Sequence, residues 1–283
     1  FLQKQGYHIT YVKVNEEGLV NPDDVDKAIR PDTILVTIMM ANNEIGTIQP
    51  IKEIAQVCKK HGVLFHTDAV QAAGNIPIDV KDLGVDLLSV SGHKFYGPKG
   101  TGMLYIRKGV KIESLIHGGH QERNRRAGTE NVPGIVGFAK ALELANENME
   151  AHYKKLKSLR DKALKGITER IPYVRVNGSM EKRLPGNLNL SFRFVEGESV
   201  LLMLDMKGIK ASSGSACTSG SLDPSHVLLA IGLPHEIAHG SLRLSFGEIN
   251  TEEDVDYLID SLDEIISKLR NMSPLYEDFT KGV

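Results

Sequence analysis

Short apolar runs alternate with a helical pattern through the first half of the chain. The run Ile34–Met40 is continuously apolar, which is typical of a buried parallel strand. Residues Pro50–His61 repeat apolar side chains at helical spacing, and Gly62 can end that helix. Further strands are expected at Val63–His66, Leu87–Val90 and Met103–Ile106. This alternation predicts an α/β fold with a mostly parallel sheet and helices on both faces, where ligands bind beyond the carboxyl ends of the strands.

Polar side chains follow two of these expected strands. Asp68 and Gln71 come after one strand, and Ser91, His93 and Lys94 come after another. A lysine that a buried strand delivers into a glycine-rich turn can be desolvated, which lowers the pKa of its ammonium group and favours the amine that forms Schiff bases. A carboxylate such as Asp68 is the partner that a pyridinium nitrogen requires. The pair therefore indicates pyridoxal 5'-phosphate as a cofactor.

Each of these residues also has a plainer interpretation. Most lysines lie in surface loops, and Asp68 could simply cap the start of a helix. The small residues on either side of Lys94 favour the functional interpretation, because they let the backbone approach a ligand closely. Ser91 and His93 could then donate hydrogen bonds to phosphate oxygens.

The second half of the chain has a different pattern. A charged helical stretch runs from Pro133 to about Ile171 and is expected to lead out of the first domain. Beyond it, Asn187–Phe192 and Ser241–Phe246 alternate like half-exposed strands, and Thr251 can cap a long final helix. We expect a large domain over residues 1–150 and a smaller α+β domain over residues 151–283. The opening residues Gly6–Val14 also have the pattern of a strand.

The two cysteines have different surroundings. Cys217 lies in a run of serine and glycine with no apolar period, which favours an exposed loop and makes its thiol a candidate nucleophile. Cys58 lies on the apolar face of an expected helix and is interpreted as a core residue. Their wide separation in sequence favours a reducing compartment over a disulfide.

Composition excludes several classes of partner. The net charge of −2 gives no reason to expect nucleic acid or an anionic membrane. No apolar run is long enough to span a bilayer, and the first residues do not form a signal peptide. His117 and His120 lack further ligands at metal-binding spacing, so no metal site is expected.

Two further side chains could bind a substrate. Arg243 alternates with leucines, so it is either an exposed strand residue or a bidentate clamp for a carboxylate. The stretch Asn42–Gly46 follows the apolar run Ile34–Met40, and an amide in it could reach the same pocket.

Taken together, these residues make the chain closely resemble the cysteine desulfurases. The resemblance is to the group of this family that supplies sulfur for iron–sulfur cluster assembly. The resemblance covers essentially the whole chain and is carried by the stretches Ala41–Gly46, His66–Gln71, Ser91–Gly100, His117–Arg123, Arg126–Thr129, Ser213–Thr218 and Ser241–Ser245. The Ser213–Thr218 stretch is similar to the group whose catalytic cysteine lies on a long mobile loop.

The resemblance implies fold type I of the pyridoxal-phosphate enzymes and a homodimer. Lys94 would hold the cofactor as a Schiff base, Asp68 and Gln71 would contact its ring, and Ser91 and His93 would contact its phosphate. Thr129 would reach the phosphate in the neighbouring subunit. Asn43 and Arg243 would hold the substrate carboxylate, with Asn43 also close to the cofactor.

The implied reaction converts L-cysteine to L-alanine. Lys94 would move the α-proton, and Cys217 would take the sulfur as a persulfide and pass it to an acceptor. The acceptors would be an iron–sulfur scaffold protein and other sulfur carriers, with tRNA thiolation as a further destination. The location would be the cytoplasm, or the mitochondrial matrix in a eukaryote.

Three alternatives stay open at this point. A selenocysteine lyase or a small-molecule transaminase could use the same scaffold, although a transaminase has no need for the cysteine loop. The family also carries an N-terminal segment with cofactor contacts that has no match here. We therefore expect the chain to be N-terminally incomplete, and an inactive fragment that serves as a binding module is the third alternative.

Overall fold

The computed structural model describes residues 1–214 and 224–282, and its contacts divide the chain into two compact units. Unit 1 comprises Phe1–Asp24, Ala41–Gln49 and Glu150–Val283, and unit 2 comprises Val25–Met40 and Pro50–Met149. Cys217 lies outside the described residues. None of the helices in the described part combines the length and apolarity that crossing a bilayer requires.

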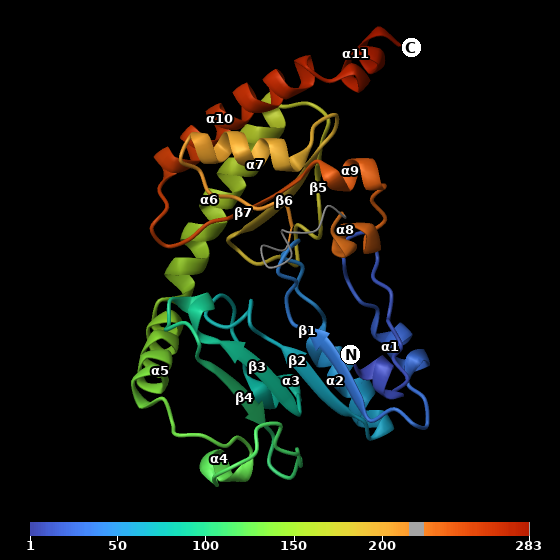
Figure 1. Ribbon diagram of the computed structural model, residues 1–283, viewed down its shortest axis with the longest axis vertical. Helices are drawn as coiled ribbons and strands as arrows, with labels where there is room; N and C mark the ends of the chain where they lie inside the picture. Colours follow the sequence, from blue (N-terminus) through green and yellow to red (C-terminus); the bar gives the residue numbers. More distant parts are fainter. Residues whose placement is uncertain (215–223, 283) are drawn as a thin grey trace. The chain divides into compact units, whose positions relative to one another are not determined.

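Unit 2 is built on a four-stranded sheet (Figure 1). The strands β1 to β3 are parallel and β4 is antiparallel, in the order β1-β2-β3-β4. Their bounds are β1 Leu35–Met39, β2 Leu64–Asp68, β3 Leu87–Ser91 and β4 Gly102–Ile106. The prediction of a mostly parallel α/β sheet is confirmed. Strand β1 is not buried as expected, because it lies at the edge of the described sheet and Leu35 is 43% exposed.

The helices of unit 2 follow the sequence signals. Helix α2 spans Ile51–His61, and Gly62 ends it in a left-handed conformation, with φ of 68°. Its four buried residues are the ones that the spacing places on one face: Ile51, Ile54, Ala55 and Cys58. The other elements are α3 Val80–Leu83, the 3₁₀ turn η2 Gly92–Phe95, α4 Gln121–Asn124 and α5 Val132–Glu147, with α1 Pro22–Ala28 divided between the two units.

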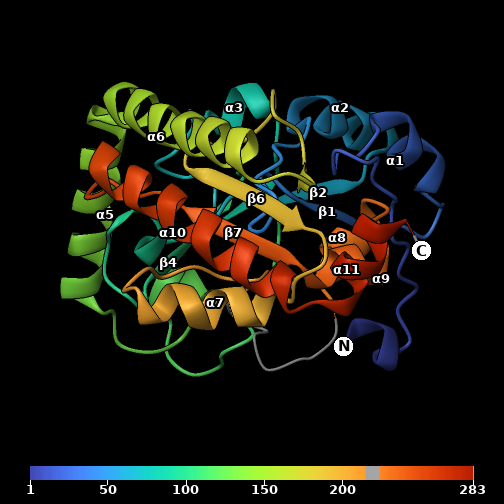
Figure 2. The ribbon, with the colours of Figure 1, turned by 90° about the horizontal axis from the view of Figure 1, so that it is seen from above.

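Unit 1 contains a three-stranded antiparallel sheet with β6 at its centre. The strands are β5 Val174–Val176, β6 Asn187–Phe192 and β7 Ser241–Ser245. The helices are α6 Met149–Arg170, α7 Gly197–Met206, α8 His226–Ala230, α9 His235–His239, α10 Glu252–Asn271 and α11 Pro274–Lys281, with the 3₁₀ turn η1 Leu2–Gln5. Figure 2 shows α6 and α10 side by side, and Lys162 and Arg170 of α6 form ion pairs with α10. Helix α10 starts at Thr251, which caps it as the sequence predicts, and Asp254 completes a capping box.

Every residue of β6 is buried, so the expectation of a half-exposed strand is wrong. The apolar residues Leu188, Leu190 and Phe192 belong to the core formed with α6, α7 and α10. On the alternate positions, the side-chain amides of Asn187 and Asn189 donate to the backbone oxygen of Glu44 at 3.0 and 3.2 Å. The polar half of the alternation therefore faces a buried hydrogen-bond network and not solvent.

The domain pattern also differs from the sequence prediction in detail. The change near residue 150 coincides with a unit boundary, but residues 1–24 and 41–49 belong with the C-terminal unit. Backbone contacts explain this, because Ser179 N donates to Glu17 O at 3.1 Å and Thr47 pairs with Arg183. The expected single helix over Pro133–Ile171 is two helices that meet at Asn148. The expected strand Gly6–Val14 is reduced to one bridge between Val14 and Val20.

Candidate active site

Asp68 ends strand β2 and begins the turn that carries Gln71. One carboxylate oxygen of Asp68 accepts a hydrogen bond from the backbone N–H of Val70 at 2.9 Å. Residues 70–75 form successive turns, so Asp68 does not cap a helix and the plainer interpretation fails. Both Asp68 and Gln71 are partly buried at the carboxyl end of the sheet, where a ligand is expected.

Lys94 lies in the short turn η2, directly after the end of β3 at Ser91. The turn is closed by Gly97 N–H donating to Gly92 O at 2.9 Å, and Gly92 N–H donates to Thr101 O at 3.0 Å. Strands β2 and β3 are parallel neighbours with Asp68 opposite Ser89. Asp68 and the Lys94 turn therefore follow adjacent strands at the same edge of the sheet.

The Lys94 turn rests on tightly packed groups. The rings of Phe95 and Phe138 meet edge to face, with centroids 5.2 Å apart. A Cβ atom at Gly92 would lie 2.8 Å from the Phe138 ring, and one at Gly97 would lie 2.8 Å from Gly92 O. Glycine is therefore required on both sides of Lys94. The side chain of Lys94 itself is exposed, so the expected desolvation is not observed; η2 projects beyond the end of the buried strand.

His66 joins the three parallel strands beside Asp68. Its ring nitrogens hydrogen-bond to Thr37 Oγ1 at 2.7 Å and to Ser89 Oγ at 2.8 Å. Burial lowers the pKa of His66, and the nearby Asp68 carboxylate partly opposes that shift. Side chains alternate along a strand, so His66 and Asp68 share one face of β2. Sequence reasoning did not single out His66, although a polar residue two positions before Asp68 is a signal that could have identified it.

The two predicted substrate-binding residues meet in unit 1. Arg243 Nη1 donates to the backbone oxygen of Asn43 at 3.0 Å. Arg243 is partly buried on β7, and its backbone pairs with Ser212. The structure therefore supports a shared location for Asn43 and Arg243 over the interpretation of Arg243 as an ordinary exposed strand residue. Glu44, next to Asn43, is 2% exposed, and no sequence pattern gave it a role.

Other residues considered in the sequence analysis lie neither with Asp68 and the Lys94 turn nor with Asn43 and Arg243. Thr129 lies exposed in the segment before α5. His117 and His120 are exposed, and within residues 1–214 and 224–282 no three potential metal ligands cluster together. Cys217 lies outside the described residues, so its role stays a prediction.

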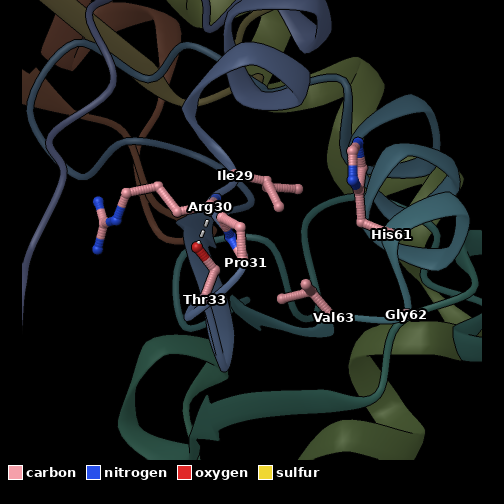
Figure 3. Close-up of a pocket in the computed structure, with 7 residues that line it drawn as sticks. All are labelled: Ile29, Arg30, Pro31, Thr33, His61, Gly62 and Val63. Atoms are coloured by element: carbon pink, nitrogen blue, oxygen red, sulfur yellow. Dashed lines mark hydrogen bonds between the residues drawn. The ribbon is translucent and has the colours of Figure 1, made fainter.

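An open pocket of about 410 Å³ lies elsewhere, at the amino ends of β1 and β2 (Figure 3). It is lined by Ile29, Arg30, Pro31, Thr33, His61, Gly62 and Val63. Within it, the backbone N–H of Arg30 donates to Thr33 Oγ1 at 2.8 Å. None of the predicted catalytic or cofactor-binding residues lines this pocket, so it does not serve the site at the opposite edge of the sheet.

Known proteins resemble this chain in sequence and in fold. The family model "Aminotransferase class-V" matches residues 1–258. The chain is 61% identical to a protein named "Cysteine desulfurase IscS" from Clostridium botulinum, over 100% of this chain and 72% of that protein. The chain belongs to the cysteine desulfurases. A second cysteine desulfurase, from Methanosarcina thermophila, is 60% identical over 97% of this chain and 68% of its own length. A solved structure titled "NIFS-LIKE PROTEIN" superposes with a TM-score of 0.87 at 42% identity, covering 94% of this chain and 70% of that one.

Enzymes of this family use pyridoxal 5'-phosphate, and the residues of this cysteine desulfurase fit that group. The sheet edge offers a carboxylate for the ring nitrogen at Asp68 and a primary amine at Lys94. The hydroxyl of Ser91 and the imidazole of His93 supply donors of the kind that phosphate requires. The residue identities and their common edge both agree with the cofactor.

Proposed function

We propose that this cysteine desulfurase converts L-cysteine to L-alanine through Lys94 and Cys217, and that the sulfur remains on Cys217 as a persulfide. The observation that carries the proposal is the arrangement of Lys94 and Asp68. They follow adjacent parallel strands at one edge of the sheet, in a chain that belongs to the cysteine desulfurases. The selenocysteine lyase and the transaminase have no comparable support.

Lys94 has two tasks in this proposal. Its amine would hold the cofactor, and the same amine would take the proton from the substrate α-carbon and return a proton later. When bound, pyridoxal phosphate withdraws electrons from that carbon. Asp68 would keep the ring nitrogen protonated, Gln71 would donate to the ring hydroxyl, and Ser91 and His93 would bind the phosphate.

Asn43 and Arg243 hold the substrate carboxylate. Arg243 is suited to this because its guanidinium can donate two parallel hydrogen bonds to one carboxylate. Its contact with Asn43 O fixes the direction of the side chain. A substrate held at its carboxylate presents its α-proton and its sulfur in constant positions. This fixed orientation accelerates the reaction.

Sulfur transfer then needs a thiolate at Cys217. Its Sγ attacks the sulfur of the bound cysteine, a sulfur–sulfur bond forms and the carbon–sulfur bond breaks. The electron pair of the broken bond stays on the carbon skeleton, which takes up a proton and leaves as alanine. One thiol and one cysteine thus give one persulfide and one alanine, so no external oxidant or reductant is required.

We place the enzyme in the cytoplasm as a homodimer, with an iron–sulfur scaffold protein and other carriers, including those of tRNA thiolation, as acceptors. Thr129 would contact the phosphate bound by a second copy of the chain, and its exposed position before α5 leaves it accessible. Sedimentation would show the dimer, and mixing Thr129→Ala protein with a Lys94→Ala variant would show whether the two copies share sites.

The proposal is tested by incubating the protein with pyridoxal phosphate and L-cysteine. We expect visible absorbance from the bound cofactor, alanine release, and sulfur on Cys217. The Lys94→Ala variant should lose both the absorbance and the alanine. Normal alanine release from the Cys217→Ala variant under repeated turnover would rule out the role of that thiol.

A further inference from the structure

Two buried asparagines of the central strand β6 have no task in the proposed function. Asn187 is 7% exposed and Asn189 is 0% exposed. The side-chain amide of each donates a hydrogen bond to the same atom, the backbone oxygen of Glu44, at 3.0 and 3.2 Å. Burying an amide is unfavourable unless it is hydrogen-bonded, so these contacts are specific features of unit 1. Their importance depends on what the backbone at Glu44 carries.

Asn189 is also the direct neighbour of the proposed substrate clamp. In the antiparallel pair of β6 and β7, Asn189 lies opposite Arg243. Residues in opposite positions point to the same face of a sheet, so the two side chains lie together. Arg243 Nη1 donates to Asn43 O at 3.0 Å, whereas Asn189 Nδ2 donates to Glu44 O. Two adjacent side chains of the sheet therefore hold two consecutive backbone oxygens.

Buried donors fix the orientation of both asparagine amides. Arg183 is 2% exposed, and its Nη1 donates to Asn187 Oδ1 at 3.2 Å. A guanidinium has no acceptor, so the amide oxygen of Asn187 must face it and the amide nitrogen must face Glu44 O. Asn177 Nδ2 donates to Asn189 Oδ1 at 2.8 Å and orients that amide in the same way. Each asparagine is thus held as a donor towards one carbonyl.

The far end of the segment 41–49 is attached to unit 1 separately. Leu184 N–H donates to Gly46 O at 2.9 Å, and Ile48 N–H donates to Lys182 O at 2.8 Å. These bonds come after the substrate-binding part of the segment. The part that carries Asn43 is held by the side chains of β6 and β7 described above. A loss of those side chains should therefore act first on Asn43 and on the guanidinium that contacts it.

We propose that Asn189, supported by Asn187, is a positioning residue that sets the affinity for the substrate carboxylate. The inference rests on the proposed function, in which Asn43 and Arg243 hold that carboxylate. A guanidinium whose own acceptor is fixed loses less freedom when it forms two parallel hydrogen bonds to a carboxylate. Asn189 touches neither the substrate nor the cofactor. It acts by keeping the backbone at Asn43 in place against Arg243.

The test compares L-cysteine with cysteamine, which has the same amine and thiol but no carboxylate. Both affinities are measured on the whole protein with bound cofactor, from the change in visible absorbance as each compound is added. Asn189→Leu replaces the amide by an apolar group with the same branching. It should weaken L-cysteine binding about fivefold to tenfold, as expected for one lost hydrogen bond, and leave cysteamine binding unchanged. Asn187→Leu should act in the same direction.

Ser191→Ala is the matched control. Ser191 is the next residue on the same face of β6, is 0% exposed, and accepts its hydrogen bond from Asn177 Nδ2 at 2.8 Å. Its replacement disturbs the same buried network through Asn177 and not through Glu44. It should lower the free energy of unfolding in denaturant and bind both compounds like wild type. If Asn189→Leu does not fold, Asn189→Ser carries the test, because its hydroxyl arm is shorter than the amide.

A double variant tests whether Asn189 acts through the clamp. Arg243→Ala should weaken L-cysteine binding on its own, because it removes the guanidinium. Adding Asn189→Leu to Arg243→Ala should cause no further loss, since residues that act as one unit do not have additive effects. Losses that add in the double variant would overturn the role of Asn189.

The remaining outcomes separate this inference from the proposed function. If Arg243→Ala binds L-cysteine as tightly as wild type, the proposed clamp fails and this inference fails with it. If Arg243→Ala weakens binding but Asn189→Leu binds L-cysteine as Ser191→Ala does, only the role of Asn189 is overturned. An equal loss of affinity for L-cysteine and cysteamine in Asn189→Leu would also overturn that role, because the defect would not involve the carboxylate.

Discussion

Gly97 is the position where a single methyl group should most directly disturb the lysine turn. A Cβ atom there would lie 2.8 Å from Gly92 O and 3.2 Å from Gly92 C, whereas ordinary contact begins at 3.4 Å. Both atoms are backbone, so one side of the turn must move by roughly 0.6 Å. The hydrogen bond from Gly97 N–H to Gly92 O, which closes the turn at 2.9 Å, would be strained at the same time.

The magnitude follows from the packing. Inserting a methyl group into a packed region costs about 1–3 kcal/mol of folding free energy. Lys94 lies two residues after Gly92 in the same turn, so its amine should shift by a comparable amount. Since a misplacement of about 1 Å can reduce rate about a hundredfold, we expect Gly97→Ala to lose roughly tenfold in cofactor affinity or alanine formation.

Gly100→Ala is the matched control for this change. Gly100 has φ of +78°, and a Cβ atom placed on it would have no heavy atom within 4 Å, so alanine there meets conformational strain but no clash. It should cost about 1–2 kcal/mol of stability and leave cofactor affinity unchanged. Denaturant unfolding and titration of the visible absorbance measure the two effects. If Gly97→Ala binds cofactor as well as Gly100→Ala does, the turn does not position Lys94 as described.

Three further changes have defined outcomes. Phe138→Ala removes the ring beneath the lysine turn, so urea unfolding should show a loss of about 3–5 kcal/mol, and a loss no larger than that of a surface substitution would contradict the packing. Thr251→Ala removes the capping box of α10 and should cost about 1 kcal/mol, with Thr251→Ser as the variant that keeps the cap. Burial, helped by Asp86, raises the pKa of Cys58 to about 11. That value lies above the pKa of the thiol in the unfolded chain. In Cys217→Ala protein, the free energy of unfolding should therefore keep its full value below pH 9 and fall as the pH rises towards 11. The additional change Cys58→Ala should remove this pH dependence.

The elements that local patterns specify could be predicted from the sequence. Helix α2 has the expected buried face and ends at Gly62, and α10 has the expected cap at Thr251. Both depend on spacing and on short-range hydrogen bonds, which a single sequence displays. The polar residues after β2 and β3 were also identified, because parallel strands bring their carboxyl ends to one edge.

Features that depend on distant contacts could not be predicted. The alternation in β6 indicated a solvent-exposed face. In the structure, the side chains of Asn187 and Asn189 instead donate hydrogen bonds to the backbone oxygen of Glu44, which is distant in sequence. The same contacts draw residues 41–49 into the C-terminal unit. The contact between Glu44 and Ser225 spans 181 positions, and no local pattern signals it. Lys94 was expected to be desolvated, yet the turn that follows β3 leaves it exposed.

The central claim is that Lys94 and Cys217 act in sequence on one cysteine, and one measurement tests it most directly. The protein with bound cofactor is mixed with sulfur-labelled L-cysteine for a single turnover, and alanine and the labelled peptides are quantified together. We expect one alanine for each labelled sulfur, with all label on the peptide that contains Cys217 and none in Lys94→Ala protein. Alanine formed without label on Cys217, or label on Cys217 in the Lys94→Ala variant, would contradict it.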